Sequence, residues 1–279
     1  MWMLLVLLYG LLKGGREIVK KKSLEKNSVL EVLIMYTSLS FLFVLPSVGE
    51  VGGVVPKDMF WIAVKSFVIF AAWILSFKAI KQMPISLYGV IDLSRVIFST
   101  ILGILIVGEI PGVFQIVGIV LVCTGLFLSG RKKKIKEEKI SGKILVFVLL
   151  SCLFNAISGA MDKILTRSVT SAQLQFWYLL FLVIYYIIFI IVTKEKIHIF
   201  KALKNYWIWI LALMFVIGDR ALFVANGMDG ARYIVMTLIK QSCCIVTLLA
   251  GKFIYKEKNI GYKTMCALII IAGIVISLL

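Results

Sequence analysis

Residues 92–112, DLSRVIFSTILGILIVGEIPG, return in altered form as residues 240–260, KQSCCIVTLLAGKFIYKEKNI, at an offset of 148 positions. The correspondence continues without a gap over residues 77–129 and 225–277. It pairs Gly103 with Gly251, Glu109 with Glu257, Gly125 with Gly273, and Asp92 with Lys240. A looser copy relates residues 17–22 to residues 162–167. The sequence therefore predicts an internal duplication that covers most of the chain.

Long apolar segments account for nearly the whole sequence. Hydrophobic residues make up 61% of it, and its mean hydropathy is +1.04. A hydrocarbon core about 30 Å thick requires roughly 20 apolar residues in a helix. The segments are apolar all round and do not alternate as strands of a membrane barrel do. We predict an all-α membrane protein with ten spans, at residues 1–19, 29–48, 60–77, 84–107, 112–129, 144–163, 172–193, 206–225, 230–250 and 260–279.

Each copy of the duplication contains five of these predicted spans. Because five is an odd number, the second copy must enter the membrane in the opposite orientation to the first. We therefore expect two inverted five-helix repeats, residues 1–129 and residues 144–279, joined by a basic linker at residues 130–143. A rotation of about 180° around an axis in the membrane plane would superpose them, as in secondary transporters whose substrate site lies between the halves.

The charges are distributed unequally between the two sets of loops. The chain has a net charge of +17, and 23 of its 31 Lys and Arg residues fall in or beside the loops that follow odd-numbered spans, at residues 13–28, 78–83, 130–143, 194–204 and 252–263. The loops of the opposite face hold only Lys57, Lys163 and Arg167. We expect a multi-pass protein of the plasma membrane. The positive-inside rule places the face with 23 cations in the cytoplasm, where the cations would contact anionic membrane lipids. Both termini would then lie outside the cytoplasm.

Several classes of function lack their sequence signals. No recognition motif interleaves Lys and Arg with exposed aromatic residues, so we expect no nucleic-acid partner. The five cysteines fall within spans without a CxxC pair, and His198 is the single histidine, which is too few ligands for a metal site. Nucleophile motifs and phosphate-binding glycine loops are absent, so we expect neither an enzyme nor a cofactor.

Two segments resemble a known family pattern, in which an acidic residue closes the fourth helix of each repeat and a glycine-bearing fifth helix follows. Residues 108–118 and Gly125 carry the first copy of this pattern, and residues 256–261 with Gly273 carry the second. In this respect the chain resembles the EamA-type branch of the drug/metabolite transporter superfamily. The resemblance implies ten helices in two inverted repeats. Members of that branch usually keep both termini in the cytoplasm, whereas the charge distribution above predicts the reverse.

Ionisable residues within predicted spans are the candidates for a substrate site, because such groups are costly in the membrane and usually pair or line a wet cavity. Tyr88, Asp92 and Arg95 share one helical face. The predicted substrate-binding residues are Lys65, Trp73, Tyr88, Asp92, Arg95, Asp219, Arg220, Lys240 and Gln241. Because the repeat relates Asp92 to Lys240, we expect these two side chains to meet near the pseudo-twofold axis.

Internal ion pairs are the alternative explanation for some of these charges. Asp92 with Arg95, and Asp229 with Arg232, have the i,i+3 spacing of helical pairs. Lys65 and Lys240 have no acidic residue at that spacing, so each needs a partner from another helix or an anionic group on the substrate.

Two further groups of charges are expected to be structural. The charges at the end of the first span, from Lys13 to Lys22, should reach the membrane interface. Glu109 and Glu257 lie at helix ends, where a carboxylate has no transport role.

Together these patterns favour a secondary transporter that moves a small polar or zwitterionic metabolite, of the amino acid or amine type, by alternating access. No nucleotide-binding motif is present, so the energy would come from an ion gradient or from the gradient of the substrate. Asp92 is the candidate carrier of a coupling proton. The alternative is a flippase or accessory subunit for an anionic lipid-linked head group, which the basic face would suit. The sequence leaves the oligomeric state open.

The loop charges yield a direct test of orientation. A reporter that fluoresces only in the cytoplasm should stay dark when fused after the last residue, because the face with fewer cations is expected outside the cell. The same reporter inserted within residues 130–142 should fluoresce. A bright C-terminal fusion would show that the charge distribution does not set the orientation.

Overall fold

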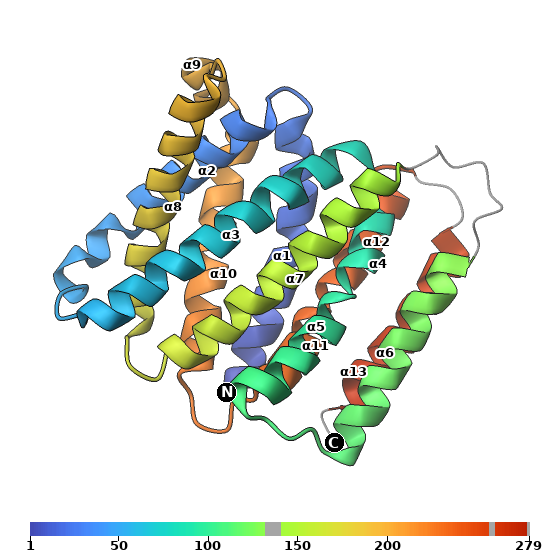
Figure 1. Ribbon diagram of the computed structural model, residues 1–279. Coiled ribbons are helices and arrows are strands. Elements are labelled where there is room, and N and C mark those ends of the chain that lie inside the picture. The colour runs from blue at the N-terminus through green and yellow to red at the C-terminus, as the bar shows by residue number, and fades with distance from the viewer. Residues whose placement is uncertain (132–140, 257–259, 278–279) are drawn as a thin grey trace.

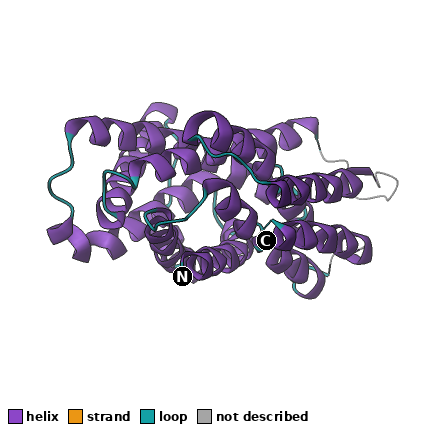
Figure 2. Cartoon of the chain, turned by 90° about the horizontal axis from the view of Figure 1, so that it is seen from below, coloured by secondary structure: helices purple, strands orange, loops and turns teal. Residues whose placement is uncertain are grey.

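The structure is a computed structural model that describes residues 1–131, 141–256 and 260–277. All regular structure in these ranges is helical, and Figure 2 shows helices and loops with no strand among them. The first half contains α1 (Trp2–Leu24), α2 (Val29–Val44), η1 (Leu45–Glu50), α3 (Pro56–Gln82), α4 (Ile85–Asp92), α5 (Arg95–Leu102), η2 (Gly103–Val107) and α6 (Val113–Arg131). The second half contains α7 (Gly142–Leu165), α8 (Ser171–Thr193), α9 (Ile199–Leu203), α10 (Tyr206–Asn226), α11 (Tyr233–Lys240), α12 (Cys243–Phe253) and α13 (Ile260–Ile276).

Seven helical segments of the described chain are long and apolar enough to cross a membrane. They are Val29–Glu50, Pro56–Gln82, Ile85–Val107, Gly142–Leu165, Ser171–Thr193, Tyr206–Asn226 and Tyr233–Phe253. The other three predicted spans coincide with α1, which carries several charges, and with α6 and α13, whose described apolar stretches are shorter. The predicted all-helical, multi-span architecture is confirmed.

Local sequence signals explain where several helices begin. Ser28 accepts a hydrogen bond from the backbone N–H of Glu31, and the Glu31 side chain accepts one from the backbone N–H of Ser28. Thr170 and Gln173 form the same reciprocal cap at the start of α8. Pro56 occupies the first turn of α3, where its missing N–H has no helical partner to lose. These helices therefore start where residues of known capping preference stand.

Helices from the two halves alternate in space. In Figure 1, α1 lies beside α10, α3 lies beside α7, and α6 and α13 form a pair at one side of the bundle. Each of these three pairs joins a helix of the first half to a helix of the second. The middle of the molecule is therefore built by both halves.

Two helices are interrupted at equivalent positions of the duplication. The first break separates α4 from α5 at residues 93–94, and the second separates α11 from α12 at residues 241–242. Backbone hydrogen bonds between residues three apart, such as the one from Ser242 N–H to the Ile239 carbonyl, tighten the chain there. Asp92 and Lys240 are the last residues before the two breaks. Irregular backbone at membrane depth is tolerated where protein surrounds it.

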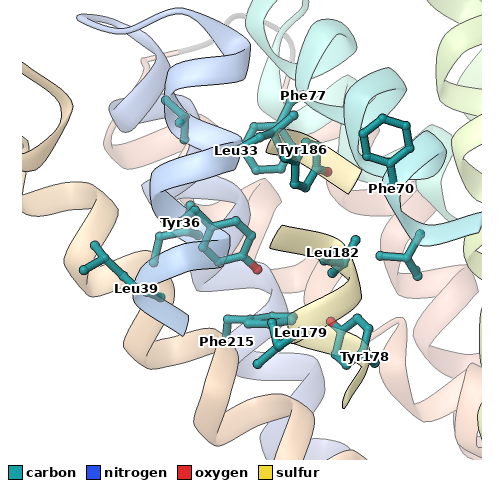
Figure 3. Packing of buried hydrophobic residues seen from close by; sticks show 14 of the residues in the cluster. Leu33, Tyr36, Leu39, Phe70, Phe77, Tyr178, Leu179, Leu182, Tyr186 and Phe215 are labelled. Carbon is teal, nitrogen blue, oxygen red and sulfur yellow. The ribbon is translucent and has the colours of Figure 1, made fainter. Parts of the chain in front are cut away.

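An aromatic core joins α2, α3, α8 and α10. Figure 3 shows Tyr36, Phe77, Tyr178, Tyr186 and Phe215 directed toward one another between these helices. The Tyr36 and Phe215 rings meet edge to face with centroids 5.1 Å apart, and those of Tyr178 and Phe215 are 6.3 Å apart. Rings at such distances add stabilisation beyond the area they bury. The core thus packs these four helices against one another.

Four of the charged residues of α1 are buried, and for these the expectation that they reach the interface is wrong, whereas Lys21 and Lys22 are half-buried. Lys13, Arg16, Glu17 and Lys20 are between 4% and 8% exposed. The helix continues to Leu24 and packs against α10, α11 and α12, so these side chains lie inside the bundle instead of at its edge. The predicted span ended at residue 19, whereas the helix includes the next five residues as well.

Glycines allow α6 and α13 to pack closely. A Cβ atom at Gly118 would lie 2.5 Å from the Gly273 carbonyl oxygen, and one at Gly273 would lie 2.7 Å from the Gly118 carbonyl oxygen. A Cβ atom at Gly125 would lie 2.9 Å from the carbonyl oxygen of Cys266. Small residues at such crossings let helix backbones approach each other within a membrane.

Replacing Gly273 with alanine tests this crossing. Alanine favours an α-helix over glycine by about 1 kcal/mol, but its methyl group would meet backbone atoms that cannot turn aside. We expect Gly273→Ala to destabilise the protein by about 1 to 3 kcal/mol, as overpacking does. Thermal unfolding in detergent would measure this loss. Gly142→Ala is the matched control, because no atom lies within 4 Å of the added Cβ; equal melting temperatures for both variants would contradict the prediction.

Candidate functional site

A polar cavity of about 90 Å³ lies in the middle of the bundle. Its walls come mainly from α1, α3, α7, α10 and α11, and hence from both halves. A space of roughly 10 to 15 Å³ in this measure accommodates one water molecule, so the cavity can hold several waters or a small solute. Its charged lining residues are Lys13, Arg16, Glu17, Lys20, Lys65, Arg95, Asp162, Asp219 and Lys240.

Asp92 is bound by two cations from different helices. The Lys13 ammonium lies 2.5 Å from one carboxylate oxygen, and the Arg95 guanidinium donates to the other at 2.7 Å. Asp92 is 3% exposed and does not itself border the cavity. Arg95 is the first residue of α5, and its i,i+3 spacing from Asp92 puts the guanidinium within reach of the carboxylate. The predicted pair of Asp92 and Arg95 is confirmed, and Lys13 is an additional partner.

Lys65 on α3 forms an ion pair with Asp162 on α7. The two charged groups are 2.8 Å apart, and the lysine is 1% exposed. The Lys65 ammonium also lies 3.7 Å from the ring centre of Tyr178 and 4.8 Å from that of Phe223. Aromatic faces attract a desolvated cation. The expectation that Lys65 requires a partner from another helix is confirmed.

Two further carboxylates at the cavity are also paired. The Arg16 guanidinium donates to Asp219 at 3.2 Å, and the Tyr178 hydroxyl donates to the second Asp219 oxygen at the same distance. On α1 itself, Lys20 donates to both oxygens of Glu17 at 2.8 and 2.9 Å. Each carboxylate of the site thus has a cation in direct contact.

Lys240 differs from the other buried cations of the site. It is 7% exposed, and within the described ranges no carboxylate lies within 4.0 Å of its ammonium group. Its ammonium instead lies 5.8 Å from the ring centre of Tyr9 and 5.9 Å from that of Tyr233. The expected contact between Lys240 and Asp92 is wrong, because Lys13 and Arg95 occupy both oxygens of Asp92.

Aromatic rings line the rest of the cavity. Trp73 lies with its ring centre 5.1 Å from those of Tyr36 and Phe215. The Tyr88 hydroxyl is 2.7 Å from the hydroxyl of Ser76. These contacts hold the rings in place, so the cavity combines fixed charges with a rigid aromatic surface.

Six of the nine predicted substrate-binding residues border the cavity: Lys65, Trp73, Tyr88, Arg95, Asp219 and Lys240. Asp92 lies behind Lys13 and Arg95. Gln241 is buried, and neither its amide oxygen nor its amide nitrogen has a hydrogen-bond partner among the described residues. Arg220 points elsewhere, donates to the Ser47 hydroxyl at 3.1 Å and borders a separate groove.

The predicted ion pair between Asp229 and Arg232 is wrong. Asp229 and Arg232 are both exposed, and the described structure contains no ion pair between them. They flank the turn before α11, where the chain is not helical and the i,i+3 geometry does not apply.

Sequence reasoning missed the contribution of α1 and the role of Asp162. Lys13, Arg16, Glu17 and Lys20 fall on one helical face within a continuous apolar segment, and this periodicity was the available signal. The looser duplication had already placed Glu17 over Asp162. Both carboxylates border the cavity.

Glu109 has the structural role expected of it. Its carboxylate accepts hydrogen bonds from the backbone N–H groups of Tyr233 and Ile234 at the start of α11. A carboxylate at a helix N-terminus satisfies free N–H groups and interacts favourably with the helix dipole. Glu109 thereby ties the end of η2 to the other half. The equivalent residue Glu257 lies outside the described residues.

The Lys65–Asp162 pair yields a stability prediction. Lys65→Met leaves the Asp162 carboxylate buried without a counter-ion, which should cost about 3 to 5 kcal/mol of unfolding free energy. The double variant Lys65→Met/Asp162→Asn should recover much of this loss, because no unpaired charge remains. Thermal unfolding of the purified variants measures both effects. Lys57→Met, at the exposed start of α3, serves as control; a Lys65→Met protein as stable as this control would contradict the buried pair.

Comparisons with known proteins were consistent with this geometry. No curated protein matches the chain. Among solved structures, a crystal structure of a protein with 12% sequence identity superposes with a TM-score of 0.71, covering 99% of this chain and 95% of the other. At that identity the likeness establishes a shared fold. The sequence profile of the EamA-like transporter family matches residues 1–131, so the first part of the chain is similar to that family.

Proposed function

We propose that the protein is a secondary transporter of the plasma membrane that carries a small polar or zwitterionic metabolite, of the amino acid or amine type, by alternating access. The observation that carries this proposal is the charged cavity at the centre of a multi-span helical protein. Charged groups are costly inside a membrane and mark substrate or ion pathways. The cargo would leave chemically unchanged.

The pairing of helices supports two inverted repeats of five helices, residues 1–129 and 144–279. A twofold exchange of the repeats would replace α1 with α7 and α3 with α10. The contact between α1 and α10 then becomes the contact between α7 and α3, and both contacts are extensive. The linker at residues 130–143 would join the repeats; residues 132–140 lie outside the described structure.

Two further observations favour the same symmetry. The exchange converts the contact of Gly118 with Gly273 into a contact of Cys266 with Gly125, which is also present. It also superposes the helix break after Asp92 on the break after Lys240. A relation of this kind places the cavity at the axis, where alternating access needs a site that both sides of the membrane can reach.

Ion pairs between the halves provide the groups that would rearrange. Arg16 with Asp219, and Lys65 with Asp162, each join a helix of the first half to a helix of the second. Rocking of the halves would lengthen these contacts in turn. The proposal includes a coupling proton, which a carboxylate of the site would carry. Asp92 is the carrier predicted from the sequence. Asp162 and Asp219 are further candidates, because they line the cavity and Asp92 does not.

The shape of the second cavity favours a metabolite over a lipid-linked head group. An apolar groove of about 430 Å³ lies against α1, α2, α8 and α10 and includes Ser47 and Arg220. None of its lining residues borders the central cavity. A flippase would need a lateral opening continuous with the polar site, so that a head group could cross while its chains stayed in lipid.

Counterflow in liposomes tests the proposal. Liposomes that contain the purified protein should take up a labelled metabolite faster when they are preloaded with the unlabelled compound. The reason is that the carrier can then reorient with cargo bound and need not reorient empty. A mixed panel of amino acids, amines and organic acids would identify a cargo, and protein-free liposomes are the control. Absence of counterflow across the panel, or translocation of a fluorescent anionic lipid without metabolite flux, would contradict the proposal.

A further inference from the structure

The charges of the central site do not balance. Six cationic groups border the cavity: Lys13, Arg16, Lys20, Lys65, Arg95 and Lys240. Four carboxylates belong to the site: Glu17, Asp162 and Asp219 in its wall, and Asp92 directly behind it. Six cations against four carboxylates leave a formal excess of two positive charges among the described residues. A buried excess of charge is unfavourable unless a counter-ion or water compensates it.

The excess can be assigned to particular groups. Asp219 contacts Arg16, Glu17 contacts Lys20 and Asp162 contacts Lys65, so three pairs are neutral. Asp92 is shared by Lys13 and Arg95, which leaves one positive charge on that trio. Lys240 carries the second. The carboxylates are thus all occupied, whereas at least one ammonium group is not.

Lys240 is positioned to receive a ligand. Its ammonium group reaches the cavity from the last turn of α11, beside the break to α12. The nearest described aromatic faces are those of Tyr9 and Tyr233, and the hydroxyl of Tyr233 is already engaged with Ser99 and the Ala156 carbonyl. Arg95 borders the same space. A ligand oxyanion would therefore meet a lysine whose charge nothing else neutralises by direct contact.

We infer that the transported compound carries a carboxylate or another oxyanion that binds Lys240, and that compounds whose only charges are ammonium groups are not bound. This inference rests on the proposed function and narrows its substrate class from polar or zwitterionic metabolites to those with an anionic group. The reason is the asymmetry of the site: a substrate ammonium would have to displace a cation from a carboxylate, whereas an oxyanion displaces only water. The rings of Tyr36 and Trp73 would face the uncharged part of the ligand.

Three four-carbon probes separate the possibilities. Succinate, 4-aminobutanoate and 1,4-diaminobutane share one skeleton and carry two, one and no carboxylates; glycerol 3-phosphate adds an arm for phosphate oxyanions. Binding stabilises the folded protein by mass action, so each probe is scored by the rise in melting temperature of the purified protein. We expect succinate or glycerol 3-phosphate to give the largest rise, 4-aminobutanoate a smaller one, and 1,4-diaminobutane none.

Variants connect the binding to Lys240. Lys240→Met should remove the rise produced by the anionic probes, and Lys240→Arg, which retains the charge, should preserve part of it. Lys252→Met is the matched control, because Lys252 is exposed on α12 and lies outside the cavity wall. Should Lys240→Met fail to fold, the ranking of the probes on the unmodified protein still decides the question.

Binding and flux separate this inference from the proposed function. A rise with 1,4-diaminobutane equal to that with succinate, no rise with any oxyanion, or an anion effect retained in Lys240→Met would overturn the oxyanion site. Counterflow of an amine, with no rise in melting temperature from any oxyanion, would support the transporter function and contradict the oxyanion site. Oxyanion binding that depends on Lys240, without flux of any compound into liposomes, would contradict the transporter function and support the oxyanion site.

Discussion

The carboxylate of Asp92, held between Lys13 and Arg95, is the interaction on which the centre of the structure depends. It fixes α1 against the α4–α5 segment. It also contacts two largely buried cations, Lys13 on α1 and Arg95 on α5. Removing Asp92 would leave two largely buried cations without this partner, which costs more than the loss of an ordinary surface pair. The break between α4 and α5 lies between Asp92 and Arg95.

Charge pairing across the halves then determines the shape of the cavity. Arg16 reaches from α1 to Asp219 on α10, and Lys65 reaches from α3 to Asp162 on α7. The aromatic core of Tyr36, Tyr178 and Phe215 fills the space beside these pairs and keeps the side chains from collapsing onto one another (Figure 3). The result is a small polar space with fixed walls, in which the ions are held by the protein and the remaining volume is left to solvent or ligand.

The same pairs also explain how such a site can change its accessibility. Contacts within one half, such as Lys20 with Glu17, can persist while the halves move. In the proposed alternating-access mechanism, contacts between the halves, such as those of Glu109 with the N-terminus of α11, would have to break on one side of the membrane for that side to open. Ion pairs of modest net strength suit this purpose, because the desolvation penalty offsets much of their attraction.

The sequence by itself determined the helical class and the presence of several long apolar spans, and it predicted the duplication. These follow from the length of apolar runs and from residue spacing, which are local properties of the chain. It also identified Lys65, Arg95, Asp219 and Lys240 as members of the site. The tertiary structure alone decided which charges meet: Lys13 and Asp92 are 79 residues apart, and Arg16 and Asp219 are 203 apart. Spacing along one helix cannot specify partners on another. The burial of the α1 charges, and the lack of a carboxylate partner for Lys240 among the described residues, therefore emerged only from the packing of the helices.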